Sequence, residues 1–589
     1  MANSILGCIC YLVLLVSLTP ANALTADQQR VLKNTSLDKS QIGRPIETKK
    51  VDRVRSEAIS DLADFIRAKL NAVRAANPIG PLLEIISEQT EQDVAEAQAN
   101  PSFLLKALTF DGSHYLDQTV FDQLNSQLAG RPINLPVLSA VPAIINEVYA
   151  AAGVLTGSAV LEPQTSENGV IHVSLIEPVV GEVRVSNVGR TKPSYIENRI
   201  GITSGEHPQF AKISQDLFVF STLNNIKLTA QFEPTDSPDI VDIILLGGNP
   251  KETTATIFHD NHGAFETGYA RFGGSFQHMN FSGYRDILSA SSIGSEGLKT
   301  GSVNYSFPVG FTGTRISAGG TYSSSRVIYG PLANTDLESQ SKSGVLSFQH
   351  PVVVEPDRIG WIGVSGNLEN LTSQISGVEL TNAKIKEASI FTNWLWRKPR
   401  YTAAFNIQIA LGNALSKTST STDGDFQYIQ GGFDLVGALS ETFAFKIDLD
   451  AKYGLSRNNP TSVLHSSGGS ASVRGYPESL LSGDSGANLT FEVSLMDTWA
   501  FETGAGGQPQ TATINPFSFF DMGIAVPFRA TGRAIKEEDV IASIGFGLNA
   551  NIGSNLSGNL TIGIPLRDTT GFDASAEDAR VSFKLASQF

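Results

Sequence analysis

The sequence predicts a mainly β protein: a sixteen-stranded antiparallel transmembrane β-barrel, preceded by two small α+β domains and an N-terminal helix. Three observations support this prediction. Apolar and polar residues alternate in segment after segment from about Lys251 to Phe589, and residues 103–248 contain a degenerate repeat of about 75 residues. Beyond the N-terminal segment, no window offers the roughly 18 consecutive apolar residues of a transmembrane helix. A closed barrel is then the structure that could cross a bilayer.

Composition narrows the possible functions. The chain has 589 residues and a net charge of −15, from 58 acidic and 43 basic side chains. An excess of acid argues against a nucleic-acid partner, which would need a basic face. The sequence also lacks the G-x-x-x-x-G-K-S/T loop that binds nucleotide phosphates. We therefore expect ATP not to be the energy source.

Residues 1–23 are predicted to be a signal peptide. They contain no charged side chain, and an apolar run from Tyr11 to Leu18 precedes the small-residue site Ala21-Asn22-Ala23. Both cysteines of the chain, Cys8 and Cys10, lie in this segment. We expect the mature protein to contain no disulfide and no thiol-ligated metal.

Residues 24–100 are predicted to form a helix followed by a linker. The helix is indicated by apolar residues at three- and four-residue steps, and Pro78 and Gly80 end it. The apolar residues of this stripe are Ile59, Leu62, Ile66, Leu70 and Val73.

The next two segments, residues 101–178 and 179–250, are predicted to be two copies of one domain. In the first copy the pattern predicts a strand (104–110), two helices (117–128 and 140–152) and two strands (157–162 and 170–176). The second copy repeats this order with a strand (180–188), two helices (194–200 and 213–224) and two strands (226–232 and 240–246).

That β-α-α-β-β order resembles the polypeptide-transport-associated (POTRA) domain. The resemblance is closest at Tyr149 to Gly153, Pro163-Gln164 and Gly169. Small domains of this kind expose a sheet edge on which an extended client peptide can add a strand. A passive spacer at the mouth of the barrel is the alternative interpretation.

Residues 251–589 are predicted to be an outer-membrane β-barrel. Sixteen segments bounded by Gly, Asn, Ser or Pro fit strands of about 9–11 residues with apolar side chains toward lipid and polar ones toward the lumen. In one segment, Phe443, Phe445 and Ile447 alternate with Lys446 and Asp448. The terminal Phe589 closes an alternating strand and resembles the signal for barrel assembly.

The connection between the eleventh and twelfth segments, from about Ser456 to Ala487, is long for a structureless loop, which usually indicates a function. It holds Val473-Arg474-Gly475-Tyr476, then Gly483-Asp484 and Gly486, and Glu492 follows on the next strand. Gly483 to Gly486 also match the nucleophile turn of serine proteases, but nothing supplies the partner His and Asp.

This loop pattern resembles the signature of the outer-membrane transporters of two-partner secretion. That family exports filamentous haemagglutinins and haemolysins (haemolysin secretion/activation proteins) and belongs to a superfamily of POTRA-plus-barrel proteins. Phe519, Asp521 and Gly523 fit the family's F-x-D-x-G pattern, and strand parity places them toward the lumen. The resemblance implies that the long loop folds back into the barrel and that Arg474 meets Asp521.

Other candidate sites are weaker. His259 and His262 stand in a His-Asp-Asn-His sequence without an evident third ligand, so a solvated hairpin is favoured over a metal site. Gly545, Gly547 and Gly553 lack the βαβ unit of a dinucleotide-binding loop. We expect no metal, no cofactor and no catalytic residue.

The resemblance implies a translocation pore in the cell outer membrane, with its POTRA domains in the periplasm. The pore would export a large unfolded exoprotein, with or without activating it, and the N-terminal helix would plug the barrel at rest or pack on the next domain. The implied partners are the exoprotein, the lipid bilayer and the barrel assembly machinery. An insertase of the same superfamily is the alternative, although insertases often carry five POTRA domains. A plain porin or adhesin would leave the repeats and the loop unexplained.

Overall fold

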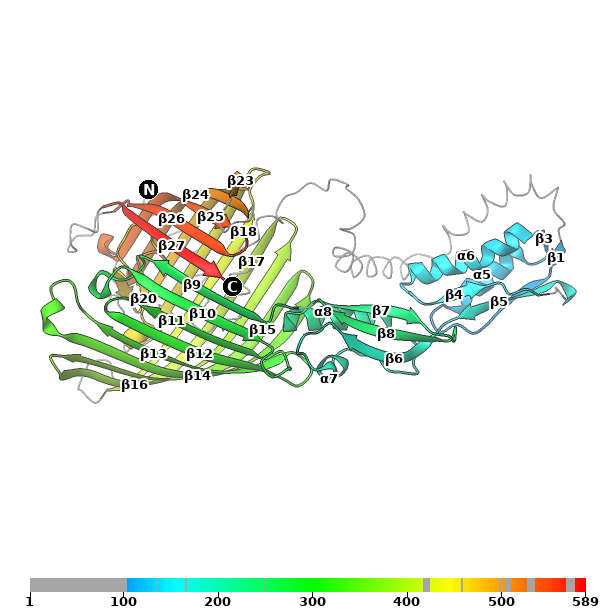
Figure 1. The fold of residues 1–589 in the computed structure, drawn as a ribbon, viewed down its shortest axis with the longest axis horizontal. Coiled ribbons are helices and arrows are strands. Elements are labelled where there is room, and N and C mark those ends of the chain that lie inside the picture. Colours follow the sequence, from blue (N-terminus) through cyan, green and yellow to red (C-terminus); the bar gives the residue numbers. More distant parts are fainter. Residues whose placement is uncertain are drawn as a thin grey trace. The chain divides into compact units, whose positions relative to one another are not determined.

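The computed structural model describes residues 103–133, 135–164, 167–248, 250–416, 424–456, 459–496, 499–503, 510–526, 535–567 and 578–589. The predicted signal peptide and the predicted N-terminal helix lie outside these residues. The chain divides into two compact units at Pro250–Lys251 (Figure 1).

The first unit begins with a small α+β domain. Its elements are β1 (Phe103–Leu105), β2 (Ala107–Phe110), α5 (Gln118–Leu128), β3 (Arg131–Ile133), α6 (Leu135–Ala151), β4 (Ser158–Val160), η3 (Glu167–Gly169) and β5 (Val170–Ile176). β5 pairs in parallel with β2 and antiparallel with β4, while β1 and β3 form a separate pair. The helices bury their apolar faces in one core around Leu105, Leu124 and Ile145. α6 starts five residues earlier than predicted and contains Pro142.

The structure explains the Y…G…PQ…G pattern of this domain. The hydroxyl of Tyr149, buried in the core, donates to Glu177 Oε1 at 2.6 Å. Gln164 exchanges two hydrogen bonds with the backbone of His172, at 2.6 and 2.9 Å. Gly169 has a φ of 79°, and a Cβ there would lie 2.6 Å from the Leu104 carbonyl oxygen. Tyr149, Gln164 and Gly169 of the pattern therefore stabilise the sheet or its connections.

A second domain follows, which repeats this order without counterparts of β1 and β3. It consists of β6 (Val179–Ser186), α7 (Pro193–Glu197), α8 (Phe210–Asn224), β7 (Leu228–Pro234) and β8 (Ile240–Gly247). β8 is the central strand, parallel to β6 and antiparallel to β7, so β6 and β7 are the sheet edges. The first half of the β6 edge is occupied, because Val180 exchanges backbone hydrogen bonds with Gly205 and Glu206 at 2.8 and 2.9 Å.

The second unit is a closed antiparallel barrel. Its strands are β9 (Thr253–Asp260), β10 (Arg271–Met279), β11 (Ile287–Gly294), β12 (Leu298–Val309), β13 (Thr314–Arg326), β14 (Leu337–Glu355), β15 (Arg358–Ile375), β16 (Val378–Lys398), β17 (Tyr401–Ser416), β18 (Gly424–Ala438), β19 (Phe443–Gly454), β22 (Ser485–Leu495), β23 (Trp499–Thr503), β24 (Gln510–Val526), β25 (Val540–Ile552), β26 (Leu556–Pro565) and β27 (Arg580–Gln588). β22 and β23 pair with successive parts of β24 and together make one strand of the wall. The predicted sixteen-stranded barrel is confirmed.

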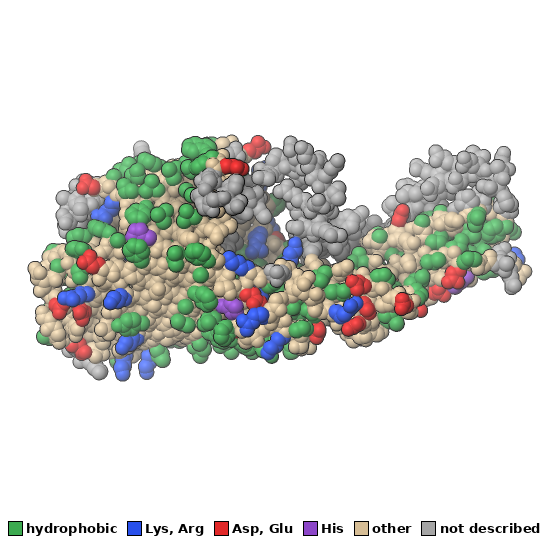
Figure 2. Space-filling view, viewed as in Figure 1, with side chains coloured by type: hydrophobic (Ala, Val, Ile, Leu, Met, Phe, Trp, Pro, Cys, Tyr) green, Lys and Arg blue, Asp and Glu red, His purple; other side chains and the backbone are tan. Residues whose placement is uncertain are grey.

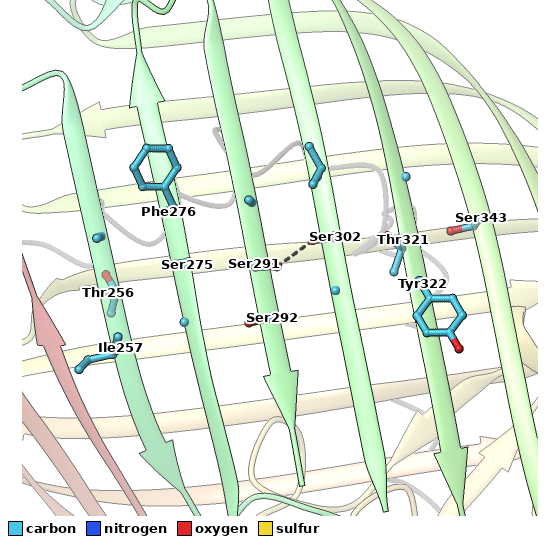
Figure 3. A pocket seen from close by; sticks show the side chains of 16 residues that line it. Thr256, Ile257, Ser275, Phe276, Ser291, Ser292, Ser302, Thr321, Tyr322 and Ser343 are labelled. Atoms are coloured by element: carbon cyan, nitrogen blue, oxygen red, sulfur yellow. Dashed lines mark hydrogen bonds between the residues drawn. The ribbon is translucent and has the colours of Figure 1, made fainter.

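The two faces of the wall differ as the alternation predicts. Large apolar side chains such as Phe272, Leu346 and Ile390 are 60% exposed or more on the outer face, and Figure 2 shows apolar side chains spread over the barrel surface. Across β9–β14, one register row places hydroxyl residues side by side. This row is Thr256, Ser275, Ser291, Ser302, Thr321 and Ser343, and it lines a pocket together with apolar neighbours (Figure 3).

The barrel closes where its last strand meets its first. β27 pairs antiparallel with β9 from Lys584 to Gln588. The terminal Phe589 extends this ladder by exchanging hydrogen bonds with the backbone of Ala255, at 2.8 and 3.2 Å. Among the described residues, no helix combines the length and apolar content needed to cross a bilayer.

Candidate functional site

The candidate site is the connection between β19 and β22, which enters the barrel. It contains a 3-10 turn, η6 (Thr461–Val463), and a short hairpin of β20 (His465–Ser467) and β21 (Leu481–Gly483). The tip of the connection lies between these two strands. Loops usually run over the surface, yet Val473 and Tyr476 of the tip are at most 2% exposed. They pack with Leu481 against Ala525 of β24 and Ile541 of β25.

Arg474 and Asp521 meet at the centre of this contact. The guanidinium donates from Nε to Asp521 Oδ2 at 2.8 Å and from Nη2 to Asp521 Oδ1 at 2.9 Å. The Arg474 backbone N–H also donates to Asp521 Oδ2, at 3.0 Å. The Asp521 side chain has no exposed surface, and that of Arg474 is 12% exposed. The structure thus brings these two predicted residues together in a buried, two-pronged ion pair.

Two further side chains complete the surroundings of the guanidinium. Its Cζ lies 3.5 Å from the centre of the Phe519 ring, and Nη1 lies 3.4 Å from Glu492 Oε2. A cation is attracted to an aromatic face and to a second carboxylate. Because an unpaired buried charge is costly, this arrangement favours an arginine at 474 over every other side chain. Lysine would lose the planar fork that matches Asp521.

Glycines allow the tip to approach the wall closely. Gly475 has a φ of 98°, and a Cβ there would lie 2.9 Å from the backbone of Gly563 on β26. From the opposite side, a Cβ at Gly563 would lie 2.5 Å from the Gly475 nitrogen. A Cβ at Gly523 would lie 2.7 Å from Val473. The sequence analysis did not single out Gly563. Its position between the outward-facing residues Ile562 and Ile564 indicates that it faces inward, where a glycine leaves room for another segment.

Tyr476 ties the tip to β25 and to the end of β26. Its hydroxyl oxygen lies 2.9 Å from the carbonyl oxygens of Ala542 and Arg567, either of which can accept a hydrogen bond from it. It also accepts from the Arg567 backbone N–H at 3.2 Å. A phenylalanine would leave these backbone groups without that partner, which explains the tyrosine of the pattern.

The second half of the pattern lies away from Arg474, at the base of the connection. Asp484 Oδ1 accepts from Asn459 Nδ2 at 2.8 Å, which joins the start and the end of the connection. A Cβ at Gly483 would lie 2.6 Å from Val526, and one at Gly486 would lie 2.3 Å from the Ile524 carbonyl oxygen. These residues therefore shape the base of the connection, where it rests on β24.

The weaker candidates have ordinary structural partners. His259 Nδ1 lies 2.9 Å from the Arg271 carbonyl oxygen and its ring stacks on Phe272, while His262 Nδ1 lies 3.9 Å from Asp260 Oδ2. Within the described ranges, no group of three or more His, Cys, Asp or Glu residues could hold a metal ion. Ser485, of the protease-like turn, accepts from the Gly454 backbone N–H at 3.1 Å.

Comparison with known families decides the assignment. Residues 242–550, more than half of the chain, match the family described as haemolysin secretion/activation protein ShlB/FhaC/HecB. The chain belongs to this family. Residues 103–178 match the ShlB-type POTRA domain. The chain is therefore a two-partner secretion transporter with a POTRA domain before its barrel.

Individual relatives agree with the family. The heme/hemopexin transporter protein HuxB of Haemophilus influenzae is 23% identical over 461 residues, which cover 74% of this chain and 79% of HuxB. CdiB from Escherichia coli has a TM-score of 0.56 at 16% identity, covering 92% of this chain and all of CdiB. BamA from Haemophilus ducreyi lacking POTRA domains 1–3 has a TM-score of 0.53 at 13% identity, covering 83% of this chain and all of that structure. These two structures share the fold.

Proposed function

We propose that this transporter carries its exoprotein through the barrel and that the β19–β22 connection obstructs the pore until export begins. The Arg474–Asp521 pair would hold the tip in the resting position from which the client displaces it, so that a tip without this pair would obstruct the lumen in no fixed position. The observation that carries this proposal is a fully buried carboxylate whose three hydrogen bonds all come from one loop residue. Without the loop residue that pairs with it, this buried carboxylate on the barrel wall would be an unpaired charge, which is costly.

Single and double substitutions test the pair. Breaking a buried ion pair costs about 3–5 kcal/mol, and water in the lumen should reduce this cost. We expect Arg474→Ala and Asp521→Ala each to lower the amount of exported client strongly while the barrel still folds. The double variant should be little worse than either single variant, because each change removes the same interaction.

The measurement is the amount of client in the medium, together with heat-modifiable mobility of the barrel on gels. Asp448→Ala is the control, because this carboxylate also lies on a barrel strand but has its ion pair with Lys446 rather than with the loop. Additive losses in the double variant would mean that the two residues act separately, and the proposal would be wrong.

We further propose that the POTRA domains bind the client by strand addition, which uses backbone hydrogen bonds and tolerates varied sequence. β7 is the better edge in the second domain, since part of the β6 edge is occupied by Gly205 and Glu206. A proline in β7 removes a donor; we expect one at Ala230 or Phe232, whose N–H groups face away from β8, to block export. Proline substitutions along β8 should instead disrupt the domain itself, because β8 is its central strand. Full export from every β7 variant would contradict strand addition at this edge.

The proposed location of the chain implies three partners: the exoprotein, the lipid bilayer and the barrel assembly machinery. The barrel would lie in the outer membrane with the POTRA domains in the periplasm, and Phe589 would serve as the assembly signal at the closing strand. Phe589→Ser should then lower the amount of folded barrel in outer-membrane fractions. The family description couples secretion with activation; we assign secretion to this chain, and comparing the specific activity of secreted and unsecreted client would test activation.

A further inference from the structure

The first half of the connection touches a different part of the barrel wall. Five buried residues of β16, β17 and β18 form an apolar patch on the inner face, and Val463 of η6 packs against it. The patch consists of Ile385, Ala410, Ala414, Phe426 and Tyr428. Nearby inward-facing positions are polar, as at Gln408 and Ser389. An apolar patch inside a polar pore is favourable when another apolar group covers it, and Val463 does so here.

A lysine joins this patch to the loop backbone. Lys452 of β19 is only 7% exposed. Its Nζ lies 3.7 Å from the centre of the Tyr428 ring and donates to the Val463 carbonyl oxygen. The carboxylates of Glu387 and Asp484 are close enough to interact with it electrostatically. The cation therefore contacts the wall and the loop at the same time.

The adjacent hairpin strand is held by the neighbouring wall strand. Asn488 of β22 donates from Nδ2 to the Ser466 carbonyl oxygen at 3.0 Å. The His465 ring fills the space left by the missing side chain of Gly486, where a Cβ would lie 2.1 Å from it. His465 Nδ1 lies 3.6 Å from Asp450 Oδ2. We call residues 459–467 the near leg and residues 473–478 the far leg.

We propose that Lys452 is a positioning residue that fastens the near leg to the wall of β16–β19, as a second latch separate from the Arg474–Asp521 pair. The two latches use different strands, different loop residues and different chemistry, so either can open while the other stays closed. The loop would clear the pore only when both have opened. The importance of this latch for export rests on the proposed function, whereas its existence can be tested directly.

Two alanines of the wall can report on the two legs. Ala414 lies under the near leg and Ala525 under the far leg, and they are 2% and 4% exposed. Since the chain has no cysteine after Cys10, Ala414→Cys or Ala525→Cys introduces a single thiol into the mature protein. The rate of its reaction with a hydrophilic maleimide, in folded barrels in detergent or liposomes, measures how often the covering leg leaves.

We expect Lys452→Met to raise the labelling rate at Cys-substituted Ala414 at least about tenfold, a ratio equal to about 1.4 kcal/mol. The rate at Cys-substituted Ala525 should change less than about twofold in the same variant. Lys446→Met is the matched control: Lys446 lies on the same face of the same strand, but its ion pair is with Asp448 rather than with the loop. It should leave the rate at 414 unchanged.

A second pair of variants tests the same latch in case the Lys452→Met variant does not fold. Tyr428→Phe keeps the aromatic face and should leave labelling at 414 unchanged, whereas Tyr428→Leu should raise it. An unchanged rate at 414 in both Lys452→Met and Tyr428→Leu would overturn the latch. Equal rises at 414 and 525 in Arg474→Ala would also overturn it, because the legs would then move together. Failure of Arg474→Ala to impair export would count against the proposed function alone.

Discussion

The two walls that touch the loop hold it in different ways. The wall of β24–β26 meets the far leg through a buried ion pair and through close contacts that Gly475, Gly523 and Gly563 make possible. The wall of β16–β19 meets the near leg through apolar packing, one cation and the close approach of Asp450 to His465. Ionic and backbone contacts demand exact distances, whereas apolar packing adapts to small shifts. Changes at the first wall should therefore have the larger effects.

Apart from the loss of the Arg474–Asp521 pair itself, the largest effect is expected from Gly563→Ala. The new Cβ would lie 2.5 Å from the Gly475 nitrogen and 2.7 Å from the Arg474 carbonyl carbon. Backbone atoms cannot move aside as a flexible side chain can, so the far leg must leave the wall, at a cost of about 1–3 kcal/mol. Labelling at Cys-substituted Ala525 should rise by about tenfold to a hundredfold, and export should fall.

Gly558→Ala is the control for this prediction. It lies on the same strand, but its Cβ would meet a Leu585 methyl group at 3.2 Å and no part of the loop. It should leave labelling and export unchanged. Similar labelling in the two variants would show that the close backbone contact does not hold the far leg.

A smaller effect is expected from Phe519→Leu. Leucine keeps the apolar volume beside Arg474 but removes the aromatic face, which contributes about 1–2 kcal/mol when a cation is desolvated against it. Labelling at Cys-substituted Ala525 should rise about fivefold to thirtyfold. Phe520→Leu is the matched control, since Phe520 points to the other face of the same strand. Equal rates in the two variants would remove Phe519 from the latch.

The smallest effect is expected at the base of the connection. Asn459→Ala removes the hydrogen bond to Asp484, for which about 0.5–1.5 kcal/mol is typical. Both legs leave this base, so labelling at Cys-substituted Ala414 and Ala525 should rise together by no more than about tenfold. A rise confined to one position would show that the base belongs to that leg alone.

The alternation of side chains was sufficient to predict the barrel, its sixteen strands and the placing of Asp521 on the inner face of the thirteenth. The reason is that successive side chains of a strand point to opposite faces of the sheet, so the face of each residue can be counted from its neighbours in the sequence. The order of elements in the small domains could also be predicted from the sequence, but the pairing of β1 with β3 could not. Those strands are three residues each and have no periodicity to detect.

The sequence by itself determined the strands, their faces and the residues of the loop pattern. Only the tertiary structure decided which atoms meet across the lumen: Gly563 against Gly475, Phe519 beneath Arg474, and Lys452 between Tyr428 and Val463. These contacts join segments far apart in the chain, and their geometry depends on how the barrel closes and on where the loop enters it. No local pattern of residues carries that information, because closure is a property of all sixteen strands together.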